Sequence, residues 1–425
     1  MIASYKGMTA EQFLESVFAR YRSAESYRDQ ARVRLSLRHN GRVVNELAPL
    51  SVWFDRNSLY VEAYDVRLRS HPSGRTAWIK DSTTRDFDSQ VVRLPPLDGR
   101  PPIDQLLTDA VLNDRIAAGL AGPPPQLEWL FAETPMAGLF DGKQKIAFGR
   151  RREIEDRPCL AVHVVADQEH YRFWIDQTEG VIRRVDLPSI LVPMQHQTIS
   201  GDSVAESMLL TLELRQATFQ SPNTQPSLAE LPARPKFVDQ FVPLPPAQPA
   251  ANLGTTPGEF ATRDQTGQIR LSNRGSDREV TVLVFALGNS SAVHASTLLT
   301  RWVGMMTSEL RTRLRVALVS DEAGFRQVPR QNTIPIFIDQ HAEVLTAMGA
   351  AEGDVIILNR NGTIQWVQSG LNSESLTQIG LIVGDVLDGI DVPTRARQQW
   401  RSDQLTYESI LSAALARHVA RQSQR

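Results

Sequence analysis

Apolar positions near the start of the chain follow two different periods. Between residues 8 and 27 they recur at helical spacing, with Thr9 placed to cap the first turn. In the next segment apolar and polar residues alternate, so that Val33, Leu35 and Leu37 share one face of a strand. The pattern predicts an amphipathic helix that leads into an antiparallel sheet.

Alternating segments continue to about residue 219, with helical segments between them. Proline and glycine bound a helical region between residues 101 and 133. Further strands are predicted at 143–150, 158–166, 169–176, 181–187 and 207–219. Many strands joined by short turns, with few helices, predict an α+β domain over residues 8–220, built on a curved antiparallel sheet.

The composition changes sharply between residues 221 and 258. This segment is rich in proline and has no sustained hydrophobic period. Proline favours extended and semi-rigid chain, so the segment is predicted to be a linker between two domains.

Strands and helices alternate from residue 259 onward. Buried strands such as VTVLVFAL and RLRVALVSD are each followed by a helical pattern, and a β-hairpin and a last helix come after them. This order predicts an α/β domain with a mixed sheet over residues 259–392. An amphipathic helical tail over residues 393–425 closes the sequence.

Composition and charge exclude several classes of protein. The 425 residues are 41% hydrophobic and 22% charged, which is typical of a folded globular protein and long enough for two domains. The formal net charge is −2 and the arginines are scattered along the chain, so nucleic acid is not a predicted partner. With Cys159 as the only cysteine, the chain can form no internal disulfide.

No segment of the sequence is apolar and long enough to predict a membrane span. Residues 1–23 also lack the apolar core of an export signal, although a signal could have been removed from the native amino terminus. We therefore expect a protein without a membrane span.

The second domain resembles the thioredoxin-like superfamily, because four features occur in the same order. They are a hairpin with Phe260, Gly267 and Leu271-Ser272, the strand VTVLVFAL, the strand IPIFID with a helix after it, and the hairpin VIILNRNG. The resemblance is strongest to thiol reductases and to proteins of the alkyl hydroperoxide reductase/thiol-specific antioxidant group. It implies a thioredoxin-like α/β sandwich.

Active members of that superfamily begin the helix after the first buried strand with Cys-x-x-Cys, where the helix N-terminus stabilises the attacking thiolate. The resemblance places these two positions at Ser290 and Val293, which cannot form a disulfide. It places the superfamily's cis-proline at Gly353. We therefore expect a redox-inactive domain that serves as an interaction module.

Two serines at this turn allow a second interpretation. Ser290 or Ser291 could be a nucleophile with His294 as its base, but no Gly-x-Ser-x-Gly turn surrounds them and no acid orients the histidine. Serine at such a place more commonly caps the helix, which is the prediction that we prefer. The sequence has no phosphate-binding, dinucleotide or zinc motif, so we predict no cofactor and no metal site.

The first domain resembles Lol-type lipoprotein carriers and related outer-membrane lipoprotein-sorting domains. The resemblance rests above all on FWIDQTEGVIRRVDL, with Asp176 and Gly180 in its turn. It implies an antiparallel half-barrel with helices, whose apolar concave face can take acyl chains. The candidate ligand contacts are Trp53, Phe54, Tyr60, Trp78, Trp129, Phe131, Phe173 and Trp174, although ordinary core packing explains the same pattern.

Taken together, the two resemblances predict a non-enzymatic protein of the bacterial envelope or periplasm. Its first domain is expected to bind a hydrophobic ligand, such as a lipid or an acylated protein, or a protein partner. One alternative is an oxidoreductase that acts with a partner's thiols, and another is a structural subunit of an assembly.

Overall fold

The chain forms two compact units in the computed structural model. Unit 1 comprises Met1–Ile199, Val204–Leu244 and Tyr407–Arg425, and unit 2 comprises Ser200–Ser203 and Pro245–Thr406. The structure describes residues 4–39, 42–56, 58–80, 85–96, 103–166, 169–192, 198–199, 203–204, 207–220, 230–258, 261–263, 269–272, 278–329, 333–339 and 341–423. Phe260 and Gly267 of the predicted hairpin lie outside these residues.

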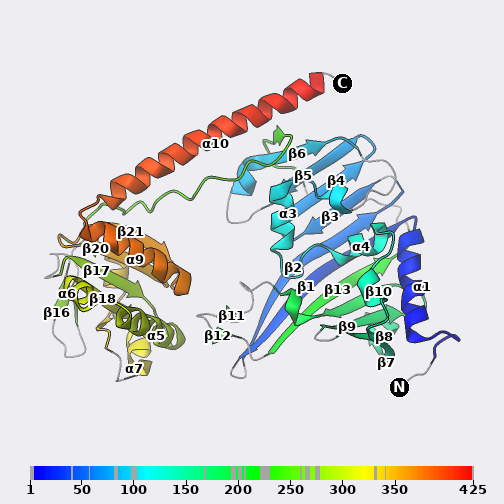
Figure 1. Cartoon of the computed structure of the whole chain (residues 1–425), viewed down its shortest axis with the longest axis horizontal. Helices are drawn as coiled ribbons and strands as arrows, with labels where there is room; N and C mark the ends of the chain where they lie inside the picture. The colour runs from blue at the N-terminus through cyan, green and yellow to red at the C-terminus, as the bar shows by residue number, and fades with distance from the viewer. Residues whose placement is uncertain are drawn as a thin grey trace. The chain divides into compact units, whose positions relative to one another are not determined.

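Unit 1 is built on a large sheet, which Figure 1 shows in blue to green. Within the described residues twelve strands join in the order β14-β6-β5-β4-β3-β2-β1-β13-β10-β9-β8-β7, with β14 parallel to β6 and the sheet otherwise largely antiparallel. The strands are β1 (Tyr27–His39), β2 (Arg42–Phe54), β3 (Leu59–Ala63), β4 (Val66–His71), β5 (Gly74–Ile79), β6 (Gln90–Leu94), β7 (Lys145–Ile154), β8 (Arg157–Ala166), β9 (Glu169–Asp176), β10 (Ile182–Leu187), β13 (Ser207–Thr218) and β14 (Lys236–Val238). The predicted antiparallel sheet is confirmed, and a Lol-type half-barrel stays a prediction.

Short helices accompany this sheet. They are α1 (Ala10–Ser23), α2 (Ile103–Leu106), α3 (Ala110–Ala117) and α4 (Pro125–Phe131), with 3-10 turns at Arg85–Ser89, Ala137–Leu139 and Ser189–Leu191 and two-residue strands β11 (Thr198–Ile199) and β12 (Ser203–Val204). The predicted cap of α1 is confirmed, since the Thr9 hydroxyl accepts a hydrogen bond from the Gln12 amide at 3.2 Å and the Gln12 side chain accepts one from the Thr9 amide at 3.0 Å.

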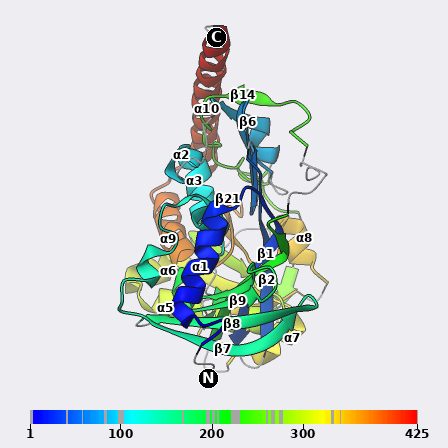
Figure 2. The same cartoon turned by 90° about the vertical axis from the view of Figure 1, so that its right-hand side faces the viewer.

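One face of the sheet carries the core of unit 1. Figures 1 and 2 show α1 running along the sheet, and its Phe13, Leu14 and Phe18 pack in the same cluster as the strands. Val33 and Leu35, predicted to share a face of the first strand, both lie in this cluster and are fully buried. Alternation therefore sends neighbours such as Arg34 and Ser36 of β1 to the opposite face.

The proline-rich segment is not a free linker over its described part, residues 230–258. It contributes β14, whose Lys236–Val238 pairs with Gln90, Val91 and Val92 of β6. Further along, the amide of Gly254 donates to Ile364 O at 2.7 Å, and the amide of Ile364 donates to Thr255 O at 2.9 Å. Residues between the prolines keep their backbone N–H groups and can form strand-like hydrogen bonds. Those up to Leu244 belong to unit 1, and those from Pro245 onward belong to unit 2.

Unit 2 is built on a mixed sheet, as the sequence predicts. Within the described residues seven strands join in the order β16-β15-β19-β18-β17-β20-β21, with β17, β18 and β19 parallel and with β20 antiparallel to β17. The strands are β15 (Ala261–Arg263), β16 (Ile269–Ser272), β17 (Val280–Phe285), β18 (Leu314–Ser320), β19 (Ile336–Ile338), β20 (Asp354–Asn359) and β21 (Ile364–Ser369). The helices are α5 (Asn289–Gly304), α6 (Ser308–Arg313), α7 (Glu322–Gln327), α8 (Glu343–Met348) and α9 (Ser373–Leu387).

Both faces of the central strands of the unit 2 sheet are buried. Val282 and Val284 of β17 pack in one cluster with residues of α5 and α9, whereas Leu283 and Phe285 pack in a second cluster with residues of α8. This explains why β17 reads as a continuous apolar run instead of an alternating one. The layered α/β arrangement holds the end of β17 and the start of α5 in a fixed place.

The last helix, α10 (Val392–Ser423), contributes to the cores of both units. Its residues before Tyr407 belong to unit 2 and those from Tyr407 onward to unit 1. Tyr407, Leu411 and Ala414 lie in the main cluster of unit 1, and the Tyr407 hydroxyl accepts a hydrogen bond from Gln90 Nε2 at 3.2 Å. The segment predicted as a tail is therefore part of the packed fold.

Candidate functional site

The turn between β17 and α5 is where the thioredoxin-like resemblance places the thiol pair. The helix begins at Asn289, and its N-cap is Gly288, which has a φ of 78° and makes no capping hydrogen bond through a side chain. The prediction that Ser290 or Ser291 caps the helix is therefore wrong. The chain needs a left-handed residue to turn from the strand into the helix, and glycine adopts that conformation most easily.

Asp321 fixes this turn from the end of the neighbouring strand. Its Oδ1 accepts hydrogen bonds from the Gly288 amide at 3.0 Å and from the Gly324 amide at 2.8 Å. The second bond caps α7, since Asp321 is the N-cap of that helix. One carboxylate oxygen thus ties the start of α5 to the start of α7.

The predicted thiol positions lie on the first turns of α5. Ser290 is in the helix, but its side chain lies outside what the structure describes. Val293 is half-buried, and its carbonyl accepts hydrogen bonds from Ser296 and Thr297 at 2.8 and 2.9 Å. These described contacts of Val293 are hydrogen bonds within α5.

Ser291 does not pair with His294, and the side chain of Ser290 lies outside what the structure describes. Ser291 Oγ donates to Glu352 Oε1 at 3.2 Å, and His294 Nε2 is buried without a hydrogen-bond partner among the described residues. A serine nucleophile needs its base within hydrogen-bond reach, which the described residues do not provide. Glu352 was missed from the sequence, because it lies 61 residues after Ser291.

Gly353 occupies the place that the resemblance assigns to a cis-proline. It has a φ of 86°, and its amide donates to Phe285 O at the end of β17 at 2.7 Å. Proline could supply neither the positive φ nor the N–H group. The backbone at this position therefore requires a residue other than proline.

We expect replacement of Asp321 with alanine to lower the stability of unit 2 by about 1–2 kcal/mol, because it removes a helix cap and the anchor of the Gly288 turn. Asparagine keeps an acceptor oxygen at the same place, so Asp321→Asn should cost less. Chemical denaturation, with hydrogen exchange of peptides from α5 and α7, measures both effects. Equal exchange rates in the alanine variant and the parent would contradict this role.

The aromatic ligand candidates of unit 1 lie on both faces of its sheet. Phe54, Trp129, Phe131 and Phe173 belong to the main core cluster, where for example the Phe54 and Phe131 rings meet at 5.2 Å. Trp174 packs on the opposite face with Cys159 and Ala161. The structure therefore does not bring all eight candidates together.

The other three candidates, Trp53, Tyr60 and Trp78, also face away from the main core. Trp53 lies directly opposite Tyr60 across β2 and β3, and Trp78 lies opposite Arg67 across β4 and β5. All three are at most 8% exposed, yet none belongs to the hydrophobic clusters of the described residues. The indole N–H groups of Trp53 and Trp78 are buried without an acceptor among these residues.

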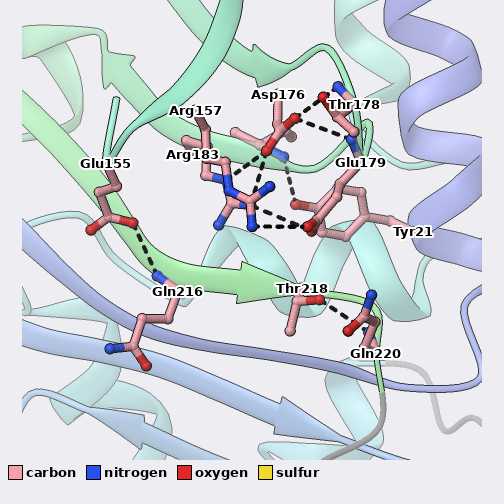
Figure 3. A network of polar contacts seen from close by, with 11 residues as sticks. Tyr21, Glu155, Arg157, Asp176, Thr178, Glu179, Arg183, Gln216, Thr218 and Gln220 are labelled. Atoms are coloured by element: carbon pink, nitrogen blue, oxygen red, sulfur yellow. Dashed lines mark hydrogen bonds and ion pairs between the residues drawn. The ribbon is translucent and has the colours of Figure 1, made fainter. Parts of the chain in front are cut away.

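A buried ion pair holds the hairpin on which the lipoprotein-carrier resemblance rests (Figure 3). Arg183 Nη2 lies 3.0 Å from Asp176 Oδ2 and 3.4 Å from Glu179 Oε2. Asp176 Oδ1 accepts hydrogen bonds from the amides of Thr178 and Glu179 at 2.8 and 3.1 Å. The described contacts of this conspicuous sequence motif stabilise a turn.

A second buried polar group is centred on Asp29, which the sequence analysis did not single out. Asp29 Oδ2 accepts hydrogen bonds from the Tyr27 hydroxyl at 2.8 Å and from Gln126 Nε2 at 3.0 Å, and its Oδ1 accepts one from the Val52 amide at 2.9 Å. Burial raises the pKa of Asp29 to about 6, although these donors lower it. Alternation alone places Asp29 on the core face and does not show what it contacts.

The described residues contain no group of three or more His, Cys, Asp or Glu that could hold a metal ion. His163 Nδ1 and His170 Nε2 are 3.2 Å apart across β8 and β9, but they form only a pair. No helix in the described part of the chain is both long and apolar enough to cross a membrane.

Of the comparisons with known proteins, only the one with solved structures finds similar proteins. No family model matches the sequence, and no curated protein matches it. A putative protein disulfide isomerase from Bacteroides thetaiotaomicron is 14% identical, with a TM-score of 0.27, and the match covers 32% of this chain and 90% of that one.

Two further solved structures are similar to the chain to the same degree. A putative thiol:disulfide interchange protein DsbE from Chlorobium tepidum is 16% identical, with a TM-score of 0.26 and coverage of 32% and 99% of the two chains. Peroxidoxin BcpB from Mycobacterium tuberculosis is 15% identical, with a TM-score of 0.26 and coverage of 32% and 97%. These structural neighbours are thioredoxin-like proteins, and they cover about a third of the chain.

Proposed function

We propose that this chain is a non-enzymatic binding protein of the bacterial envelope. Unit 1 binds a hydrophobic ligand or an apolar segment of a partner, and the thioredoxin-like unit 2 is an interaction module that carries out no thiol exchange. The observation that carries the binding half is the group of Trp53, Tyr60 and Trp78 on the sheet face away from the core. The buried indole N–H groups of Trp53 and Trp78 have no acceptor among the described residues. An apolar ligand with acceptor oxygens would accept hydrogen bonds from them.

The environment of the only cysteine supports the non-enzymatic half of the proposal. Cys159 lies in β8, is fully buried, and packs with Ala161 and Trp174. Burial, followed by the nearby charge of Asp176, raises the pKa of this thiol to about 11. A reactive cysteine needs the opposite, an accessible thiol with a lowered pKa.

We expect Cys159 to react with Ellman's reagent at least about 100-fold more slowly in the folded chain than in the chain unfolded in guanidinium. A rise of the thiol pKa from 9.0 to about 11 alone reduces the thiolate fraction at neutral pH by about that factor. The absorbance of released thionitrobenzoate measures both rates. A folded chain that reacts as fast as the unfolded one would contradict the burial of this thiol.

The binding half is tested with the full chain and the fluorescent fatty acid 11-(dansylamino)undecanoic acid. We expect saturable binding with a component that weakens by about tenfold in Trp53→Ala and is partly kept in Trp53→Phe, because phenylalanine restores most of the apolar contact. Leu381→Ala, which removes an exposed side chain of unit 2, is the control and should bind normally. No saturable binding, or normal binding by Trp53→Ala, would overturn the proposed site in unit 1.

The oxidoreductase alternative is tested by insulin reduction and peroxide turnover. The proposal expects neither activity from the full chain. Turnover that persists in Cys159→Ser, and therefore needs no thiol of this chain, would show that the protein is an enzyme.

A further inference from the structure

Unit 2 contains an apolar cavity away from the turn between β17 and α5. Its volume is about 610 Å³, within the range of about 300–1,000 Å³ that is typical of small-molecule sites. The proline-rich segment, β21, α9 and the first half of α10 form its walls. The residues that line it are Pro246, Ala247, Gln248, Pro249, Ala250, Leu253, Trp366, Val367, Ser369, Ile382, Val392, Arg395, Ala396, Gln399, Trp400 and Asp403.

One wall of the cavity follows α10. The lining residues of this helix recur every three or four positions from Val392 through Ala396 and Trp400 to Asp403. They therefore lie on one face of about three helical turns, a length of about 16 Å at 1.5 Å per residue. An extended hydrocarbon chain can therefore contact this wall along its length.

The charged groups at the cavity already have partners. Arg395 forms an ion pair with Asp385, and Asp403 accepts a hydrogen bond from Gln399 Nε2 at 2.8 Å. Ser369 donates to Asp354 at 2.9 Å. A ligand charge placed inside would have to displace one of these contacts, so the part of the ligand within the walls is uncharged.

We propose that this cavity binds the hydrocarbon chain of an acylated molecule, with its polar headgroup left at the solvent-exposed rim. Prolines, alanines and branched aliphatic residues make the lining largely apolar, and Trp366 and Trp400 add two aromatic rings. A free fatty acid and a monoacyl lipid offer the same hydrocarbon chain to the walls. This site goes beyond the proposed function, because it lies in unit 2 and needs none of the aromatic residues of unit 1.

Two residues allow the cavity to be changed with little effect on the fold. Trp400 is half-buried and belongs to none of the hydrophobic clusters of the described residues, so Trp400→Ala removes a wall and leaves the core in place. Ala250 is half-buried and lines the cavity from the proline-rich segment, so Ala250→Phe fills the space. Gln398→Phe adds the same ring to an exposed position of α10 outside the lining and is the matched control.

The test is a fluorescence titration of the full chain with 11-(dansylamino)undecanoic acid and, separately, with a dansyl-labelled lysophosphatidylcholine. We expect the parent to bind the probe at two sites. Trp400→Ala and Ala250→Phe should each weaken by about tenfold or more the site that Trp53→Ala leaves unchanged, with melting temperatures close to that of the parent, and Gln398→Phe should bind normally. Binding of the fatty acid alone would identify a free acid as the source of the chain. Binding of both probes would support a site that recognises only the hydrocarbon.

The outcomes also separate this inference from the proposed function. Normal binding by both Trp400→Ala and Ala250→Phe would overturn the cavity as a site, and loss of that binding in Trp53→Ala would then place it in unit 1. Binding that depends on Trp400 and not on Trp53 would support the cavity and overturn the site in unit 1. A full chain that binds neither probe would overturn both.

Discussion

Replacement of Asp176 with alanine is expected to lower the free energy of unfolding of unit 1 by about 3–5 kcal/mol. Asp176 is fully buried, and the Arg183 side chain with which it pairs is 5% exposed. The variant would leave the Arg183 charge buried with only Glu179 beside it, at 3.4 Å, and would leave the amides of Thr178 and Glu179 without their acceptor. An unpaired buried charge costs far more than the loss of an ion pair at the surface.

Denaturation of the full chain, with hydrogen exchange of peptides from β9 and β10, measures this effect where it arises. Asp176→Asn keeps an oxygen for the two amides and loses only the charge, so it should be less destabilising. Arg326→Ala removes an ion pair with Glu322 in which both side chains are more than half exposed, and should change stability by about 0.5 kcal/mol or less. If Asp176→Ala cost no more than Arg326→Ala, the ion pair would not be what holds the hairpin.

The second large effect is a dependence of stability on pH that comes from Asp29. Burial raises the pKa of this carboxyl from 3.8 to about 6, so between these values the folded chain holds a proton that the unfolded chain releases. Its contribution to stability is therefore greatest below about pH 4 and is lost as pH rises through about 6. A shift of about two pKa units corresponds to about 3 kcal/mol.

Denaturation of the parent and of Asp29→Asn between pH 4 and pH 8 isolates this contribution, because other groups cancel in the difference. We expect the parent to lose about 3 kcal/mol relative to Asp29→Asn as pH rises across the window. Asp176 provides a contrast of opposite sign. Burial acts to raise its pKa, but the amides of Glu179 and Thr178 and the Arg183 side chain outweigh burial and lower it, so its contribution is lost as pH falls. A flat difference for Asp29 would contradict its protonation in the folded state.

Local periodicity predicted those parts of the fold that depend on neighbours in sequence. The alternation of Val33 and Leu35 gave the buried face of β1, and the Thr9 cap gave the start of α1. The continuous apolar run of β17 indicated a strand buried on both faces. In each case the physical cause, one side of an element turned away from water, acts within a few residues.

Contacts between distant residues could not be predicted in this way. Asp321 lies 33 residues after Gly288, whose amide it binds, and nothing in the sequence between them marks the pair. The sequence predicts a serine cap for α5, but the N-cap is Gly288. Its positive φ depends on how the strand meets the helix in space, which residue types alone do not show. The eight aromatic candidates show the same limit, since alternation indicates that a face is buried but not which face of the sheet holds the core.

The division of α10 between the two units has a consequence for the order of folding during synthesis. Tyr407, Leu411 and Ala414 are part of the core of unit 1, and Gln90 Nε2 donates a hydrogen bond to the Tyr407 hydroxyl. The strands of unit 1 leave the ribosome long before these residues do, whereas unit 2 is already complete at Thr406. Unit 2 can therefore finish folding first, although domains usually fold from the amino terminus onward, and unit 1 closes its core last.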